Sequence, residues 1–243
     1  MPVIPYKKSE LNKKRQVEDM FDSVSHSYDM LNHLLSFNID KIWRRSAIQR
    51  LREYNPSTII DLATGTADFA IAATRLKPKK ITGIDLSEGM LEIGRRKVGR
   101  KGLAHLITLI KGDSEKLPFD DSLFDAAIVG FGVRNFENLE KGLSEAYRVL
   151  VPGGVFGVLE FSLPRNKIFR KLYFFYFKKV LPFVGGLISK DGSAYRYLTE
   201  SVEEFPYGES FMNKLRKTGF INCRCYLKTF GIVSVYLSQK PKI

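Results

Sequence analysis

The sequence predicts an α/β fold with a mostly parallel seven-stranded sheet that ends in an antiparallel hairpin. Between residues 58 and 161, short apolar runs alternate with segments of helical periodicity. This alternation is typical of βαβ units, whose parallel sheet is covered by helices on both faces. After residue 220, two runs of alternating hydrophobicity follow each other directly, and this pattern predicts a hairpin.

The individual elements follow from apolar spacing and from residues that start or stop helices. The first 55 residues are helical: Ser9 is the expected cap of a first helix, and a second ends before Asn55 and Pro56. Strands are expected at residues 58–62, 80–84, 106–110, 124–131 and 155–161. Helices are expected between them at residues 66–76, 87–98 and 139–150. A last helix at 211–218 precedes the hairpin strands 221–229 and 232–238.

An insertion of about residues 164–206 separates the fifth strand from this ending. Residues 164–190 contain seven basic and seven aromatic side chains and no acidic one. From 167 to 180 the spacing is helical, with Lys167, Arg170, Lys171 and Lys178 on one side and apolar residues on the other. We interpret residues 1–243 as a single domain, with a helical N-terminal cap (1–55) and a helical lid (164–206).

The composition limits the possible classes of protein. The 243 residues are 44% hydrophobic, which excludes disorder of the whole chain. No apolar run approaches the roughly 20 residues of a membrane span, the first residues do not resemble a secretory signal, and two cysteines favour a reducing cytoplasm. The net charge of +13, from 39 basic and 26 acidic residues, indicates an anionic partner such as nucleic acid or a membrane surface.

Polar residues follow three consecutive predicted strands. Asp61 ends the first strand and leads into a turn of small residues around Gly65, Asp85 ends the second, and Asp113 and Ser114 follow the third. A carboxylate in the position of Asp85 can accept hydrogen bonds from both ribose hydroxyls, and an acceptor at 113–114 can meet the adenine amino group. The pattern therefore predicts an adenosine site at the carboxyl ends of the strands.

Three features favour S-adenosylmethionine (SAM) over a dinucleotide as the adenosine ligand. The turn lacks the glycines that bind a pyrophosphate, the third strand is followed by the turn 112–118, and the chain ends in a hairpin. Together these features resemble the class I SAM-dependent methyltransferase fold.

Four longer motifs resemble one family within that fold, the UbiE/MenG C-methyltransferases of ubiquinone and menaquinone biosynthesis. They occur in the expected order at residues 28–43, 131–135, 148–162 and 194–206, so the resemblance spans nearly the whole chain. Leu31, Asp40 and Val151 depart from the family signatures, which have Met, His and Lys there. Gly130 stands where some members carry Ser, so no side-chain contact is transferred to it.

The resemblance implies SAM as co-substrate, with Thr66, Asp85, Asp113 and Ser114 as cofactor contacts beside Gly65. It implies methylation of a polyprenylated demethylmenaquinol, with a polyprenyl benzoquinol of the ubiquinone route as the alternative. RNA methylation is a more distant alternative because the chain lacks an RNA-binding module, an Asn-Pro-Pro-Tyr-type motif and paired catalytic cysteines. A surface-binding protein that retains a relic cofactor fold is a non-enzymatic alternative.

Transfer of a methyl group to a quinol ring requires activation of the ring. A phenolate is a better carbon nucleophile than a neutral phenol, so a group that removes or stabilises the phenolic proton is expected. We expect Arg134 to stabilise the phenolate and Tyr28 to donate a hydrogen bond to a quinol oxygen. His33 is a less favoured candidate, Tyr195 and Tyr197 are further candidates for lining the ring pocket, and no metal site is expected.

The charge of the insertion predicts where the protein acts. Basic and aromatic residues interleaved on one amphipathic helix are typical of an interface with anionic lipid. We therefore expect a cytoplasmic protein that associates peripherally with the inner face of the membrane and has no nucleic-acid partner. The sequence does not predict an oligomeric state.

Overall fold

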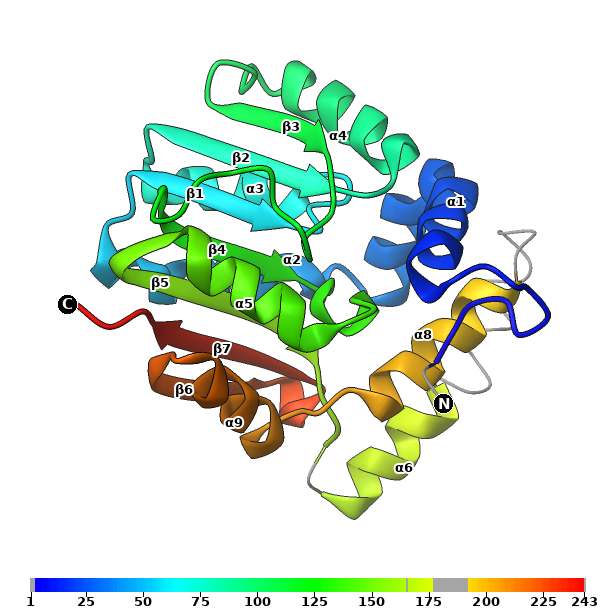
Figure 1. Ribbon diagram of the computed structural model, residues 1–243. Helices are drawn as coiled ribbons and strands as arrows, with labels where there is room; N and C mark the ends of the chain where they lie inside the picture. The colour runs from blue at the N-terminus through cyan, green and yellow to red at the C-terminus, as the bar shows by residue number, and fades with distance from the viewer. Residues whose placement is uncertain (1–2, 165, 177–191, 243) are drawn as a thin grey trace.

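A computed structural model describes residues 3–164, 166–176 and 192–242 (Figure 1). Within these residues, seven strands form one sheet in the order β3-β2-β1-β4-β5-β7-β6. The strands are β1 (Thr58–Leu62), β2 (Lys80–Asp85), β3 (Ile107–Lys111), β4 (Phe124–Gly130), β5 (Leu150–Phe161), β6 (Ile221–Lys228) and β7 (Val233–Gln239). The first five strands are parallel, and β7 is antiparallel to both β5 and β6.

Helices cover both faces of the sheet. They are α1 (Lys13–Leu35), α2 (Ile39–Leu51), α3 (Asp68–Ala73), α4 (Glu88–Arg100), α5 (Leu139–Val149), α6 (Lys167–Phe175), α8 (Gly192–Glu204) and α9 (Glu209–Thr218). Successive strand residues point to opposite faces, so Ile59 packs with α2, α3 and α4 while Ile60 packs with α5 and α9.

The direction of the strand order reverses between β1 and β4, which lie side by side and are parallel. At such a reversal the connections leave to opposite sides of the sheet, and a crevice opens at the carboxyl ends of the strands. Helices α1, α6 and α8 gather beyond these carboxyl ends (Figure 1). The N-terminal segment and the insertion, which lie outside the alternating strands and helices of residues 58–161, therefore meet at the edge of the sheet where this crevice opens.

The sequence predicted the order of strands and helices correctly, and the differences are local. Ser9 does not cap the first helix: its hydroxyl accepts from Leu11 N, whereas the Asn12 side chain accepts from Arg15 N and α1 starts at Lys13. Ser87, the first residue of the predicted helix 87–98, caps α4 by accepting from Met90 N. Strand β5 begins at Leu150, earlier than predicted, because it extends beside β4 through an irregular register.

Helix α6 confirms the first part of the helix predicted from residue 167. Much of the apolar side of α6 is exposed, since Ile168, Leu172 and Phe175 are 77%, 62% and 61% exposed, whereas Tyr173 is buried. Residues 177–180 of the predicted helix, including Lys178, lie outside the described residues. Among the helices that the structure does describe, none is long and apolar enough to cross a membrane.

Candidate active site

The carboxyl ends of β1, β2 and β4 border a pocket that contains every residue predicted to contact the cofactor. Gly65, Thr66, Asp85, Asp113 and Ser114 all line it. The chain turns out of β1 through three residues of positive φ, Ala63, Gly65 and Ala67. A Cβ atom on Gly65 would meet no atom within 4 Å, so the backbone here faces open space, where a ligand can approach closely.

Asp85 is held by backbone amides at the end of β2. Its Oδ2 accepts from Gly65 N at 2.8 Å, and its Oδ1 accepts from Ser87 N at 2.9 Å. Burial raises the pKa of Asp85 to about 6, although the amide hydrogen bonds oppose this shift. Asp85 therefore connects the turn after β1 with the start of α4, and it lines the pocket where the ribose was predicted.

Two buried acceptor atoms of this pocket lack a hydrogen-bond partner among the described residues, namely Asp61 Oδ1 and Asn135 Oδ1. The other oxygen of Asp61 accepts from Thr64 Oγ1 at 2.6 Å and from Ala70 N at 3.0 Å, and burial raises the pKa of this carboxyl to about 7. Buried acceptors are normally paired. The methionyl ammonium of SAM is a donor of the kind they require, so the residues present suit that ligand.

Thr66 and Asp113 line the pocket, but both have partners from the N-terminal helix. Thr66 Oγ1 donates to Asp29 at 2.5 Å, and Lys14 Nζ pairs with Asp113 Oδ2 at 2.7 Å. The second oxygen of Asp113 accepts from Glu115 N at 2.9 Å. Asp113 can therefore meet an adenine amino group only by sharing an oxygen with one of these donors.

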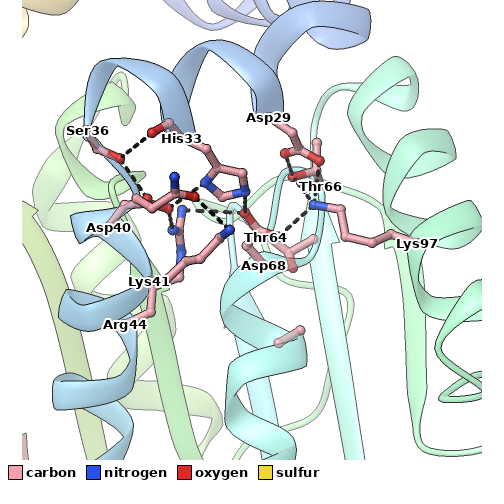
Figure 2. Close-up of polar contacts among 12 residues, drawn as sticks. Asp29, His33, Ser36, Asp40, Lys41, Arg44, Thr64, Thr66, Asp68 and Lys97 are labelled. Atoms are coloured by element: carbon pink, nitrogen blue, oxygen red, sulfur yellow. Dashed lines mark hydrogen bonds and ion pairs between the residues drawn. The ribbon is translucent and has the colours of Figure 1, made fainter.

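A polar network joins α1 and α2 to the cofactor pocket (Figure 2). Lys97 Nζ pairs with Asp29 at 2.5 Å and with Asp68 at 2.6 Å. His33 Nδ1 lies 2.9 Å from Asp40 Oδ2, and Arg44 contacts that same oxygen. His33, Asp40 and Asp68 are close enough to hold a metal ion, but Arg44 and Lys97 already neutralise the carboxylates. We therefore interpret the cluster as an ion-pair network.

A second, larger cavity of about 530 Å³ adjoins the cofactor pocket. The side chains of Phe21, Tyr28, Arg44 and Phe131 line both spaces, so the two meet there. The walls of the second cavity are mainly apolar, with Trp43, Phe131 and Phe161 in mutual ring contact. Its residues come from α1, α2, α6, α8, the ends of β4 and β5 and the β6–β7 turn.

Arg134 projects into the apolar cavity from a short 3₁₀ turn, η3 (Val133–Asn135). Its Nη1 is 2.9 Å from Oε1 of Glu160, a carboxylate that is 0% exposed, and also donates to Phe131 O. Its Nε is buried and has no hydrogen-bond partner among the described residues. Glu160 thus fixes Arg134 through Nη1 and leaves the Nε–H without a partner among the described residues, so the ion pair and a role toward a ligand are compatible.

Of the other candidate residues from the sequence, the structure places some beside the two spaces and one outside them. Tyr28 lies at the junction of the two spaces, where burial raises the pKa of its hydroxyl. His33 lines neither space and instead belongs to the network of α1 and α2. Tyr197 lines the apolar cavity, whereas the side chain of Tyr195 lies outside what the structure describes.

Three residues of these spaces were not assigned a role from the sequence. Asn135 follows Arg134 in the motif 131–135, and Arg44 follows Trp43 in the motif 28–43, so the motifs contained the signal for both. Lys14 belongs to a basic run, and nothing in the local sequence indicates that it reaches Asp113.

Comparison with known proteins agrees with this geometry. Residues 8–240 match the ubiE/COQ5 methyltransferase family. The chain belongs to this family. A demethylmenaquinone methyltransferase of Bacteroides fragilis is 46% identical over 229 residues, with 94% of each chain covered. The ubiquinone/menaquinone biosynthesis C-methyltransferase UbiE of Geobacter sulfurreducens is 43% identical and covers 94% of this chain and 90% of its own.

Solved structures agree on the fold of this ubiE/COQ5 family member. A SAM-dependent methyltransferase of Thermotoga maritima superposes with a TM-score of 0.62 at 22% identity, covering 92% of this chain and 99% of its own. An O-methyltransferase fold from Nostoc punctiforme gives a TM-score of 0.70 at 14% identity, covering 96% and 64%. The chain is thus a SAM-dependent methyltransferase of class I fold.

Proposed function

We propose that this enzyme transfers a methyl group from SAM to a ring carbon of a polyprenylated demethylmenaquinol, as in menaquinone biosynthesis. The observation that carries the proposal is the apolar cavity of about 530 Å³ that adjoins the cofactor pocket and shares Phe131 with it as a wall residue. Apolar walls with a few convergent polar groups suit a hydrophobic ring with oxygen substituents. The name of the Bacteroides relative, demethylmenaquinone methyltransferase, supports the same acceptor.

The chain's own residues would activate the ring at the junction of the two spaces. When bound, SAM supplies a sulfonium methyl group, which a ring carbon takes while the carbon–sulfur electron pair goes to sulfur and the ring proton is released. Arg134 would hold the ionised quinol oxygen through its free N–H, because a guanidinium stabilises an anion and cannot act as a base. Tyr28 would donate a hydrogen bond to the same ring, and the apolar walls would exclude water.

The benzoquinol of ubiquinone biosynthesis is not favoured as the acceptor. The B. fragilis and Thermus thermophilus relatives are both named for demethylmenaquinone alone. We therefore propose the naphthoquinol ring as the methyl acceptor.

An acceptor competition tests the proposed function. The full-length enzyme is incubated with methyl-labelled SAM, reduced demethylmenaquinone in detergent and total RNA, and the label in each acceptor is counted. The label is expected in the quinol and not in RNA. Label in RNA without label in quinol would contradict the proposal and favour the RNA alternative. Replacing the quinol by the reduced benzoquinol analogue, at equal concentration, compares the two rings.

The segments outside the sheet are proposed to enclose the acceptor within a single methyltransferase domain. We infer that residues 1–55 act as a cap and that the insertion 164–206 acts as a lid. Residues of α1, α2, α6 and α8 line the apolar cavity, which supports this division. The contact between Lys14 and Asp113 further ties α1 to the cofactor pocket.

We propose that the mouth of the apolar cavity faces an anionic membrane surface on the cytoplasmic side. The apolar rim, which we define as Phe37, Phe169, Leu172 and Phe175, lines the cavity although its side chains are exposed. The exposed basic residues of α6 lie next to it in sequence. An apolar patch bordered by cations suits a bilayer interface, through which a polyprenyl tail can enter.

A groove lined by basic residues of α2 and β6 supports the membrane proposal. Phe169 stacks on the exposed Phe230 of the β6–β7 turn, with ring centroids 4.5 Å apart. Just before this turn, Lys228, Arg224 and Arg50 line a groove of about 560 Å³. Positive charge beside an exposed aromatic pair complements the headgroups of anionic lipids.

A further inference from the structure

Tyr197 lines the apolar cavity and carries a buried hydroxyl. The residue belongs to α8, is 2% exposed, and packs with Val17 and Met20 of α1. It also lines the cavity in which the ring of the acceptor is proposed to bind. The insertion thereby contributes a polar group to an otherwise mainly apolar wall.

The hydroxyl of Tyr197 has no hydrogen-bond partner among the described residues. Burying an unpaired hydroxyl destabilises the folded state, and a phenylalanine of the same shape would avoid that cost. Packing alone therefore gives no reason for an oxygen atom at this position. A polar group of the ligand is the expected partner.

Arg134 Nε is a second buried atom of the same cavity without a partner in the described residues. The two residues lie on elements that pack together, α8 and η3, and the charges of Arg134 and Glu160 act on the Tyr197 hydroxyl. Burial raises the pKa of Tyr197, so the hydroxyl keeps its proton at neutral pH. Both unpaired groups are thus hydrogen-bond donors.

We infer that Tyr197 Oη–H and Arg134 Nε–H together bind one oxygen of the acceptor and stabilise its ionised form. Two donors complement an oxygen anion and not a cation or another donor. The inference rests on the proposed quinol methylation and adds a residue from the insertion to it. Tyr197 acts here as a catalytic residue, since it touches the oxygen next to the reacting carbon.

This arrangement has a kinetic signature that depends on pH. A hydrogen bond to the charged form of an acid lowers the pKa of that acid. Because the quinol oxygen is charged after ionisation, one such hydrogen bond is expected to lower the pKa of the bound quinol by roughly one to two pH units. Loss of the Tyr197 hydroxyl therefore raises the pKa of the bound quinol. In the variant, the pH below which kcat declines (the acid limb) is therefore higher than in the wild type. Above that pH, where the bound quinol is ionised in both enzymes, their kcat values are expected to converge.

Tyr197→Phe tests this inference by steady-state kinetics with reduced demethylmenaquinone. Below the acid limb, kcat is expected to fall about tenfold for each pH unit by which the limb moves, while the Kd for SAM stays unchanged. The thermal midpoint is expected to be unchanged or higher, because the hydroxyl has no partner to lose among the described residues. An unchanged pH profile with unchanged kcat would overturn the inference, and so would a clear fall of the thermal midpoint.

Tyr236→Phe is the matched control. The Tyr236 hydroxyl accepts from Gly208 N at 2.7 Å, and the residue lines neither space of the site. The control should lower the thermal midpoint and leave kcat and its pH profile unchanged. A wild-type enzyme that transfers no methyl to the quinol would contradict the proposed function itself. An active wild type with an unaffected Tyr197→Phe variant contradicts only the inference.

Discussion

Unpaired buried atoms at the residue scale indicate what each space of the site binds. Among the described residues, the cofactor pocket has free acceptors, Asp61 Oδ1 and Asn135 Oδ1, and the apolar cavity has free donors, Arg134 Nε and Tyr197 Oη. A ligand with a cationic amine suits the first set, and a ligand with an anionic oxygen suits the second. The polarity of the site therefore changes across η3, the turn that carries Arg134 and Asn135.

The role of Arg134 is tested best by changing its buried partner at the same time. Arg134→Met alone would leave the Glu160 carboxylate buried without a counterion, which costs about 3–5 kcal/mol. The double variant Arg134→Met, Glu160→Gln removes the charge of both. We expect kcat to fall by about 10²–10³, as for the loss of an anion-stabilising donor, with unchanged SAM binding measured by calorimetry.

Glu160→Gln alone is the control for the double variant, because the amide oxygen still accepts from Arg134. Its kcat should fall far less than that of the double variant. Full turnover by the double variant with SAM binding intact would show that Arg134 is only an ion-pair partner.

Sequence could predict residues at strand ends but not those that depend on distant packing. Gly65, Asp85, Asp113 and Ser114 follow strands whose order and direction are set locally, and all of them line the cofactor pocket. The partner of Asp113, Lys14, lies 99 positions away along the chain. The unpaired hydroxyl of Tyr197 likewise results from the packing of α8 on α1 and η3, which no local pattern encodes.

At the scale of elements, α6 departs from the usual pattern for amphipathic helices in a folded protein. Such a helix normally turns its apolar stripe toward the core. In α6 only Tyr173 is buried, and the other apolar residues of the helix are exposed or partly exposed together with its basic residues. The sequence predicted the two sides of the helix, but it could not predict that much of the apolar side is exposed, because that depends on the neighbours α6 meets.

The exposed cations of α6 are expected to guide the protein to anionic membranes. The triple variant Lys167→Gln, Arg170→Gln, Lys171→Gln should lose about 1 kcal/mol of binding per residue. This loss corresponds to a decrease in affinity of up to roughly 100-fold in total. Sedimentation with liposomes of phosphatidylglycerol and phosphatidylcholine at several salt concentrations measures the effect. Turnover of a short-chain quinol in solution should stay unchanged.

A matched triple variant separates the position of the charge from its amount. Lys77, Lys79 and Lys80 are exposed where the chain enters β2, at the amino ends of the strands. Changing these three to Gln removes the same charge from the opposite end of the sheet and should leave liposome binding nearly unchanged. Equal losses in both triple variants, or binding that ignores lipid charge, would contradict the proposed membrane face.

In the whole molecule, the sheet and its covering helices place the cofactor pocket and the apolar cavity next to each other. The reversal of strand order opens the cofactor pocket, and α1, α2, α6 and α8 build the apolar cavity beyond it. The alternation of strands and helices made the sheet predictable from the sequence. The size of the cavity was not predictable, since it is the space left between helices that are far apart in the chain.

The position of the transferred methyl group on the product distinguishes ring methylation from ether formation. The enzyme is incubated with SAM carrying a ¹³C-methyl group and with demethylmenaquinone in reduced or oxidised form, and the product is analysed by carbon NMR. We expect a methyl group bonded to a ring carbon, formed from the reduced acceptor only. A methyl ether on a quinol oxygen, or equal methylation of the oxidised quinone, would contradict activation of the ring through an ionised oxygen.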